Sequence, residues 1–554
     1  MKNNDNSIAS FFSKQSVFVI LVVCALFLRF KHEIAFPQLD SDYAVQIEAA
    51  KNYIEGKGFV NATATTDDLS IIHVKPLVKW PVGFPILLAG SFYIFHNWFN
   101  AGIFLQLLSV SLLLFSILKI FTLFGISRPV KALFVIFFGL SSSPFNYWAT
   151  TDMMSVAVFL YITYLVLKQS YTNEYKLSTF LFISMLSAFN CTVRFAYIPN
   201  LFILPLFYLL LWFIRKNKAL LIGAAVTASA SVLLTFLFFS FFKIDPDRTN
   251  FLQSLLHQKL YWNHLKWFDS FPIKAFFYLS PLEYRLPVAR PDIIRLVRIL
   301  IHIASVALVC FFAWKLFIKD KIQTYLKSTQ PGQRLMFDYT ALSLIAAAAV
   351  IGIMVLESLA TSPEGNSFGP AWMPKMWTFV YATRYFALQM MMLQILLFVL
   401  LFQSGNGNDR FSQFFIRGFL SVSICWAALF FAYSNYQLYA PHGNGGGEFW
   451  VNDKENIHIY KILHETNLAR GDKHVVFSDA EWKGAPITEF SGPTPCPAYT
   501  DLINNRFKTS RPVILLLKMH AKDMQTPEEK EFIRLHQAQL LLSEKNSELY
   551  KVEI

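Results

Sequence analysis

Two acidic residues, Asp40 and Asp42, follow the first apolar segment of the chain, so they are expected near a membrane surface. Residues 43–55 read as a helix that ends at a glycine. One aspartate can be the N-cap of that helix, but a cap needs only one side chain. The remaining carboxylate is a candidate general base, able to take the proton of an attacking hydroxyl. Which of the two is the base stays open.

A third carboxylate, Asp152, lies in a very short turn between two apolar runs. The sequence Thr-Thr-Asp before an apolar run also fits a helix N-cap. Ionisable groups so close to hydrocarbon are costly, which makes a functional role the default hypothesis. We expect Asp152 to assist the first pair, by orienting an acceptor or by sharing a divalent cation with it.

Three basic residues complete the candidate set: Lys79 beside Trp80, Arg194 in a turn between two apolar runs, and Arg384 where an apolar run begins. Arginine suits bidentate binding of phosphate, and lysine supplies a point charge. The alternative is that the lysine snorkels at the membrane interface and the arginines anchor lipid headgroups. The functional interpretation is a site for a phosphate-bearing substrate.

The composition indicates the setting in which these residues act. The 554 residues are 55% hydrophobic and only 15% charged, with a mean hydropathy of +0.41, whereas a soluble protein has about a quarter charged residues. Apolar runs of about 17–25 residues recur, each long enough to cross a bilayer. The net charge of +13 lies largely in loops between these runs, which favours membrane orientation and anionic lipid over nucleic acid.

We expect about eleven membrane spans. An outer loop, 35–99, contains an apolar segment, 82–97, which we interpret as a helix lying at the membrane surface. The expected spans are 16–34, 100–123, 131–149, 153–168, 177–193, 197–214, 219–242, 293–318, 335–358, 385–403 and 416–436.

Lysine and arginine in the short loops predict a cytoplasmic N-terminus. Every inside loop is then basic, as at Arg128 with Lys131 and at Arg215 with Lys216. The loop 243–292 is also basic although it is expected outside, but long loops weigh less in this rule. The active site and the C-terminal domain would then face the extracytoplasmic side of the inner (plasma) membrane.

Residues 437–554 change character and predict a small soluble α/β domain, distinct from the membrane domain 1–436. Strands are expected at 474–477 and 513–517, and a helix at 527–542. No phosphate-binding loop or catalytic triad is evident in it. The fold class is therefore mainly α: a polytopic helical bundle with a small C-terminal domain. The five cysteines form no close pair, so no disulfide framework or metal site is indicated.

The order of these motifs resembles the GT-C superfamily of membrane glycosyltransferases, and within it the protein O-mannosyltransferase and aminoarabinose-transferase type. An acid follows the first span, a short helix ends in Gly-x-Gly-aromatic at 56–59, and Pro-x-Gly-aromatic-Pro follows at 81–85. The acid at Asp152 and the Arg-Tyr pair at Arg384 also fit. The resemblance covers about residues 16–436 and is strongest over 37–90.

The resemblance implies a role for several positions. Asp42 or Asp40 matches the family's catalytic first-loop aspartate, Asp152 matches its second-loop acid, and Lys79 resembles the lysine that contacts the donor phosphate. Two departures stand out: this chain has Asp-Ser-Asp where the family often has Asp-Glu, and Trp80 replaces the first proline of a Pro-Pro pair.

The implied activity is transfer of a sugar from a polyprenyl-phosphate donor to an extracytoplasmic hydroxyl of a glycan, lipid or protein, with inversion. The residues favour a metal-independent enzyme without a cofactor, although a divalent cation is possible. Beyond the donor and acceptor, membrane lipids are the expected partners. Two other classes stay open: a transporter or flippase of a lipid-linked saccharide, and a non-catalytic membrane assembly protein. A transporter would place charges at mid-membrane and break helices in paired halves.

Overall fold

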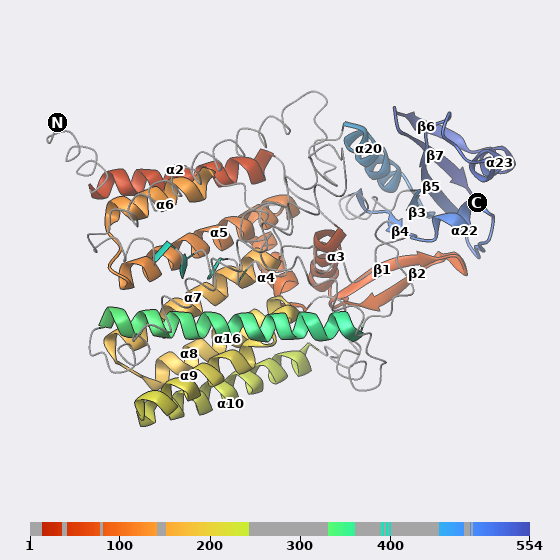
Figure 1. Cartoon of the computed structure of the whole chain (residues 1–554). Coiled ribbons are helices and arrows are strands. Elements are labelled where there is room, and N and C mark those ends of the chain that lie inside the picture. Colours follow the sequence, from red (N-terminus) through yellow and green to blue (C-terminus); the bar gives the residue numbers. More distant parts are fainter. Residues whose placement is uncertain are drawn as a thin grey trace, which may run out of the picture. The chain divides into compact units, whose positions relative to one another are not determined.

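The computed structural model is mainly helical, with a small region of sheet near the C-terminus (Figure 1). It describes residues 14–35, 41–77, 81–140, 151–242, 331–360, 454–480 and 491–554, with a few single positions at 388–399 and at 488. The chain divides into two compact units. Unit 1 comprises Met1–Arg29 and Gln106–Ala432, and unit 2 comprises Phe30–Leu105 and Tyr433–Ile554.

Unit 1 is a bundle of helices. Within it, α7 lies against α8 and α16, while α10 packs on both α8 and α9 (Figure 1). The division between the units falls within α2 and α5. The helices are α2 (Gln15–Ala35), α5 (Trp98–Leu123), α6 (Arg128–Leu140), α7 (Thr151–Thr172), α8 (Leu177–Val193), α9 (Asn200–Arg215), α10 (Lys218–Phe241) and α16 (Pro331–Ala360), with a 3₁₀ turn, η2 (Phe195–Tyr197).

The expected spans that fall on described residues coincide with helices. Of the described helices, α5, α7 and α10 are long and apolar enough to cross a membrane. α8, α9 and the first part of α2 are shorter apolar helices. The total of about eleven spans stays a prediction, because 293–318, 416–436, most of 385–403 and the end of 131–149 lie outside the described residues.

Small residues let these helices approach closely. Gly223 on α10 faces the ring of Phe180 on α8, and a Cβ at that position would lie 2.4 Å from the ring. Gly139 on α6 meets the backbone of Ala25 on α2 in the same way. Small residues at helix contacts are typical of membrane bundles, where packing rather than hydrophobic burial drives association.

Unit 2 combines the first outer loop with the C-terminal residues. A five-stranded mixed sheet has the order β4-β3-β5-β7-β6, in which β5 is parallel to β3 and antiparallel to β7. A separate hairpin pairs β1 with β2. The elements are α3 (Ser41–Ile54), β1 (Val60–Thr65), β2 (Asp68–Pro76), α4 (Gly83–Phe95), α20 (Lys454–Leu468), β3 (His474–Asp479), β4 (Thr494–Pro495), α22 (Tyr499–Ile503), β5 (Val513–His520), α23 (Pro527–Leu535), β6 (Gln539–Ser543) and β7 (Ser547–Glu553).

The strands expected at 474–477 and 513–517 are confirmed as β3 and β5. The helix expected at 527–542 is correct at its start but too long, because α23 ends at Leu535. Gln537 adopts a positive φ of 50°, which ends the helical path. Leu540 and its neighbours then form the edge strand β6. The apolar residues 540–542, which the sequence analysis assigned to the end of the helix, thus belong to a strand.

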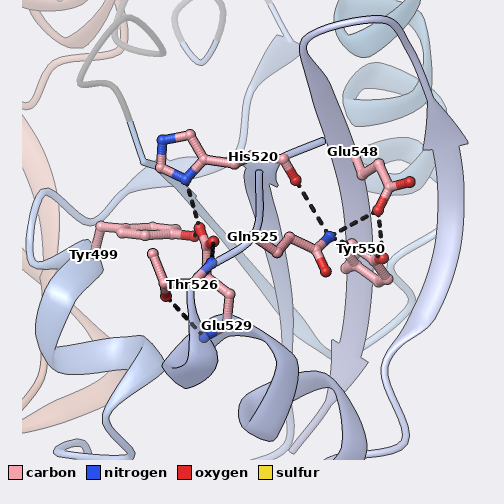
Figure 2. Close-up of polar contacts among 7 residues, drawn as sticks. All are labelled: Tyr499, His520, Gln525, Thr526, Glu529, Glu548 and Tyr550. Atoms are coloured by element: carbon pink, nitrogen blue, oxygen red, sulfur yellow. Dashed lines mark hydrogen bonds and ion pairs between the residues drawn. The ribbon is translucent and has the colours of Figure 1, made fainter. Parts of the chain in front are cut away.

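A network of polar contacts connects α23 to β5 and α22 (Figure 2). The buried Glu529 carboxylate accepts hydrogen bonds from the Tyr499 hydroxyl and, at 2.8 Å, from the Thr526 backbone N–H, and its Oε1 lies 2.9 Å from Nδ1 of His520. Thr526 Oγ1 accepts the Glu529 N–H in return, which completes a capping box. Burial and the contact with Glu529 raise the pKa of Tyr499 far above its usual value. We interpret this network as structural, since these contacts cap and orient α23.

Candidate active site

Asp152 lies in the first turn of α7 and is 3% exposed. Its helix begins at Thr151, two residues before the expected span 153–168, so Asp152 lies within the helix rather than at its N-cap. A buried carboxylate beside apolar helices needs a compensating charge, because transfer of an ionised group from water is costly. Arg194 supplies that charge.

Arg194 follows α8 in an extended conformation, and its N–H donates to the carbonyl of Asn190. Its side chain returns to the start of α7. Nη1 lies 2.8 Å from Oδ2 of Asp152 and donates to Oγ1 of Thr151 at 2.9 Å. Both contacts use the same guanidinium nitrogen, so the two α7 residues fix the orientation of the arginine. The structure thus brings together two residues that the sequence singled out separately.

Both helices also carry buried polar side chains. Ser155 lies one turn after Asp152 on α7, and Ser187 and Asn190 lie one turn apart near the end of α8. Helices α7 and α8 pack together, and Arg194, just after α8, meets Asp152 at the ion pair.

Several atoms of these side chains have no hydrogen-bond partner among the described residues. They are Oγ of Ser155, Oγ of Ser187 and both amide atoms of Asn190, all on side chains that are 0% exposed. Buried polar groups in folded proteins are nearly always satisfied. These atoms are therefore candidate hydrogen-bonding partners for a polar group in this part of the bundle.

The structure describes little of the other four candidate residues. Asp42 is the second residue of α3, but its side chain is outside the described residues. Asp40, Lys79 and Arg384 also lie outside them. Their proximity to Asp152 stays a prediction. Among the described residues, no group of three or more histidines, cysteines and acids could hold a metal ion. The possible divalent cation at the first-loop acids also stays a prediction.

A second buried ion pair was missed by the sequence analysis. Arg215 at the end of α9 pairs with Asp338 of α16 and donates to Oγ of Ser170 at 2.8 Å and to the hydroxyl of Tyr175 at 3.2 Å. The hydroxyl of Ser170 donates to the other carboxylate oxygen of Asp338. The sequence signal for this pair was Asp338, an acidic residue inside the apolar run 335–358. Arg215 was interpreted only as a basic residue of a short loop.

The two ion pairs lie at opposite ends of α7. Asp152 and Ser170 are separated by about 27 Å along the helix, at a rise of 1.5 Å per residue. A bilayer has a hydrocarbon core about 30 Å thick. Between Asp152 and Lys168, α7 carries no charged residue. The spacing is that expected of charges placed near the two surfaces of a membrane.

Asp338→Asn will destabilise the protein without removing a group that we place at the substrate. The variant leaves Arg215 buried without its counter-charge, and breaking a buried pair costs about 3–5 kcal/mol. We expect a clearly lower thermal unfolding temperature of the detergent-solubilised chain. Replacing both partners, as Arg215→Met with Asp338→Leu, should recover much of the loss. An unchanged unfolding temperature for Asp338→Asn would contradict the structural role of this pair.

No protein-family model matches the chain, and no characterised protein matches it in sequence. Among solved structures, it is similar to ArnT from Cupriavidus metallidurans bound to undecaprenyl phosphate, with a TM-score of 0.45, 11% identity and 97% of each chain covered. It is also similar to the oligosaccharyltransferase of Archaeoglobus fulgidus in its apo form, with a TM-score of 0.46 and 11% identity over 92% of this chain and 70% of that one. The oligosaccharyltransferase AglB from Archaeoglobus fulgidus, in complex with an inhibitory peptide and a dolichol-phosphate, gives a TM-score of 0.43 at 9% identity over 91% of this chain and 69% of that one.

All of these similarities are distant. With TM-scores below 0.5 and identities near a tenth, they do not identify what the chain does.

Proposed function

We propose that this protein is a membrane glycosyltransferase that moves a sugar from a polyprenyl-phosphate donor to an acceptor hydroxyl, with inversion at the anomeric carbon. The observation that carries the proposal is the buried ion pair between Asp152 and Arg194, continued by buried polar atoms that have no partner among the described residues. A buried pair of this kind is weak evidence for stability alone, because the cost of removing both charges from water offsets their attraction.

The leaving group explains the need for cations. When the bond between the sugar and the phosphate breaks, polyprenyl phosphate is the leaving group. Its developing negative charge requires stabilisation by cations rather than a proton from a strong acid. In the proposal Lys79, Arg194 and Arg384 hold the phosphate. The role of Asp152 is to orient the Arg194 guanidinium, a role supported by the contacts that both Thr151 and Asp152 make to one of its nitrogens.

The acceptor hydroxyl needs a general base on the face of the sugar opposite the phosphate. Asp42, or Asp40, takes that proton in the proposal. Direct displacement of phosphate by the hydroxyl inverts the anomeric carbon, as in the single-step route of inverting glycosidases. The reaction consumes the acceptor and donor and yields the glycosylated acceptor and free polyprenyl phosphate.

The proposal places the protein in the inner (plasma) membrane as a multi-pass protein, with its active site and C-terminal domain on the extracytoplasmic side. The basic short loops support this orientation. The ion pairs at the two ends of α7 support a position in which this helix crosses the bilayer, with one ion pair near each surface.

A transporter or flippase is the alternative that the charges of the bundle disfavour. A transport pathway places ionisable residues near the middle of the membrane. Among the described helices, α8 has no charged residue, and α10 has only Lys218 at its start. The charges of α7 lie near its ends. The Asp152–Arg194 pair lies at one end of α7, as a site for chemistry near a membrane surface requires.

Mass analysis of cell-surface glycans, with and without the protein, tests the proposal. We expect the loss of one sugar unit from one class of glycoconjugate, together with accumulation of a polyprenyl-phosphate sugar. The wild-type gene should reverse both changes. Identical glycans and identical lipid-linked sugars in the two strains would contradict the proposed activity.

A further inference from the structure

The β1–β2 hairpin of the first outer loop is joined to the C-terminal domain by backbone hydrogen bonds. The N–H of Leu69 donates to the carbonyl of Lys508 at 2.9 Å, and the N–H of Lys508 donates to the carbonyl of Thr66 at 2.9 Å. On the neighbouring strand, the hydroxyl of Thr63 donates to the carbonyl of Pro495 at 3.2 Å. These contacts join segments more than 400 residues apart in the sequence.

The tip of the hairpin adds polar and apolar contacts. The Asp68 carboxylate accepts the N–H of Ser70 at 2.9 Å, its hydroxyl at 2.6 Å and the N–H of Ser510 at 3.2 Å. The hydroxyls of Ser70 and Ser510 lie 2.9 Å apart. Hydrogen bonds from Ser510 and Ser70 hold the pKa of Asp68 well below its usual range. Leu69 is fully buried within the same hydrophobic core as Leu515 of β5.

The helix that carries Asp42 is tied to this hairpin in turn. The Glu48 carboxylate of α3 accepts the N–H of Ala62 at 2.5 Å and the side-chain amide of Asn61 at 2.7 Å. The same amide of Asn61 donates to the carbonyl of Val45 at 2.8 Å. Asn52 donates from its side chain to the carbonyl of Val60 at 2.7 Å. The C-terminal domain, hairpin and α3 therefore form a continuous set of packed elements.

We infer that the C-terminal domain is a positioning element for the first-loop carboxylate, acting through the β1–β2 hairpin and α3. The inference rests on the proposed transferase function, in which Asp42 is the base. It assigns Asp68 and Leu69 as positioning residues, since they hold the hairpin on the domain and do not themselves touch substrate. A general base must be held within hydrogen-bonding reach of the hydroxyl proton, and a displacement of about 1 Å can cost as much as about a hundredfold in rate.

The test compares two double variants of the same hairpin. Asp68→Ala with Leu69→Ala removes the docking contacts, whereas Asp67→Ala with Ile71→Ala makes the same two types of change at exposed positions. Transfer is measured in membranes from cells that lack the protein, with added purified full chain. For the docking variant we expect a kcat about tenfold lower and little change in the KM of the donor. For the control variant we expect wild-type kinetics.

A cross-link supplies a rescue that a general loss of folding would not allow. Ser70→Cys with Ser510→Cys places two thiols where the hydroxyls now lie 2.9 Å apart. Added to the docking variant, this pair should form a disulfide and restore kcat when oxidised, and lose that gain when reduced.

The outcomes separate the inference from the function on which it rests. An unaltered kcat in the docking variant, or a disulfide that forms without restoring kcat, would overturn the inference. Failure of the cysteine pair to cross-link in the otherwise wild-type chain would also overturn it. By contrast, full transfer by an Asp42→Asn and Asp40→Asn double variant would contradict the proposed mechanism itself.

Discussion

An Asp42→Asn variant of the full chain will insert and fold like the wild type but transfer sugar at least about a hundredfold more slowly, because a general base contributes about 10²–10⁴-fold to rate. Helix α3 begins at Ser41, so Asp42 is the second residue of the helix. Asparagine keeps the size of the side chain and removes only its charge. The measurement is sugar transfer per mole of protein in membranes.

Two companion variants give this prediction its controls. Glu55→Gln removes an acid just after the end of the same helix, where the side chain is 51% exposed, and should leave transfer unchanged. Asp40→Asn tests the second member of the pair. If Asp40→Asn abolishes transfer while Asp42→Asn does not, Asp40 is the base. If each single variant and the double variant all transfer at the wild-type rate, no first-loop base exists and the mechanism is wrong.

Breaking the Asp152–Arg194 ion pair will have the second large effect on the rate of sugar transfer. Asp152→Asn and Arg194→Met should each lower kcat by about a hundredfold, comparable to the loss on removing one donor that stabilises a developing anion. Each will also destabilise the chain by about 3–5 kcal/mol, since the remaining partner stays buried without its counter-charge. Stability and activity must therefore be measured together, as thermal unfolding and as initial rate below the unfolding temperature.

Asp338→Asn is the matched control for this pair. It breaks a buried ion pair of the same bundle, at the other end of α7, away from the proposed chemistry. At equal loss of unfolding temperature, we expect Asp152→Asn to lose far more activity than Asp338→Asn. Equal losses of activity would show that the Asp152 pair only stabilises the bundle, and the assignment of Arg194 to the phosphate would then be withdrawn.

The helices of the bundle were accessible from the sequence because each is long, apolar and bounded by charged or polar residues. Thr-Thr-Asp before an apolar run indicated the start of α7 to within two residues, at 153 against the observed Thr151. The pairing of Asp152 with Arg194 did not follow. It depends on how α7 and α8 are rotated about their axes, and local patterns do not specify that rotation for helices that are apolar on most sides.

The first outer loop shows a different limit. Its helix α3 and the glycines that end it were expected, and Gly56 has the positive φ of 78° that suits a helix C-terminus. The hairpin of β1 and β2 was not anticipated within 35–99. Its core contact, Leu69, packs against residues from the far end of the chain. A single sequence contains no local signal for such a long-range contact.

The most direct measurement of the central claim is the release of free polyprenyl phosphate by the purified full chain. The donor and acceptor are supplied by membranes from cells that lack the protein. The account predicts that wild-type protein releases polyprenyl phosphate in step with the addition of one sugar to an acceptor, and that Asp42→Asn and Asp152→Asn release almost none. Absence of release by the wild type, or equal release by the wild type and both variants, would contradict it.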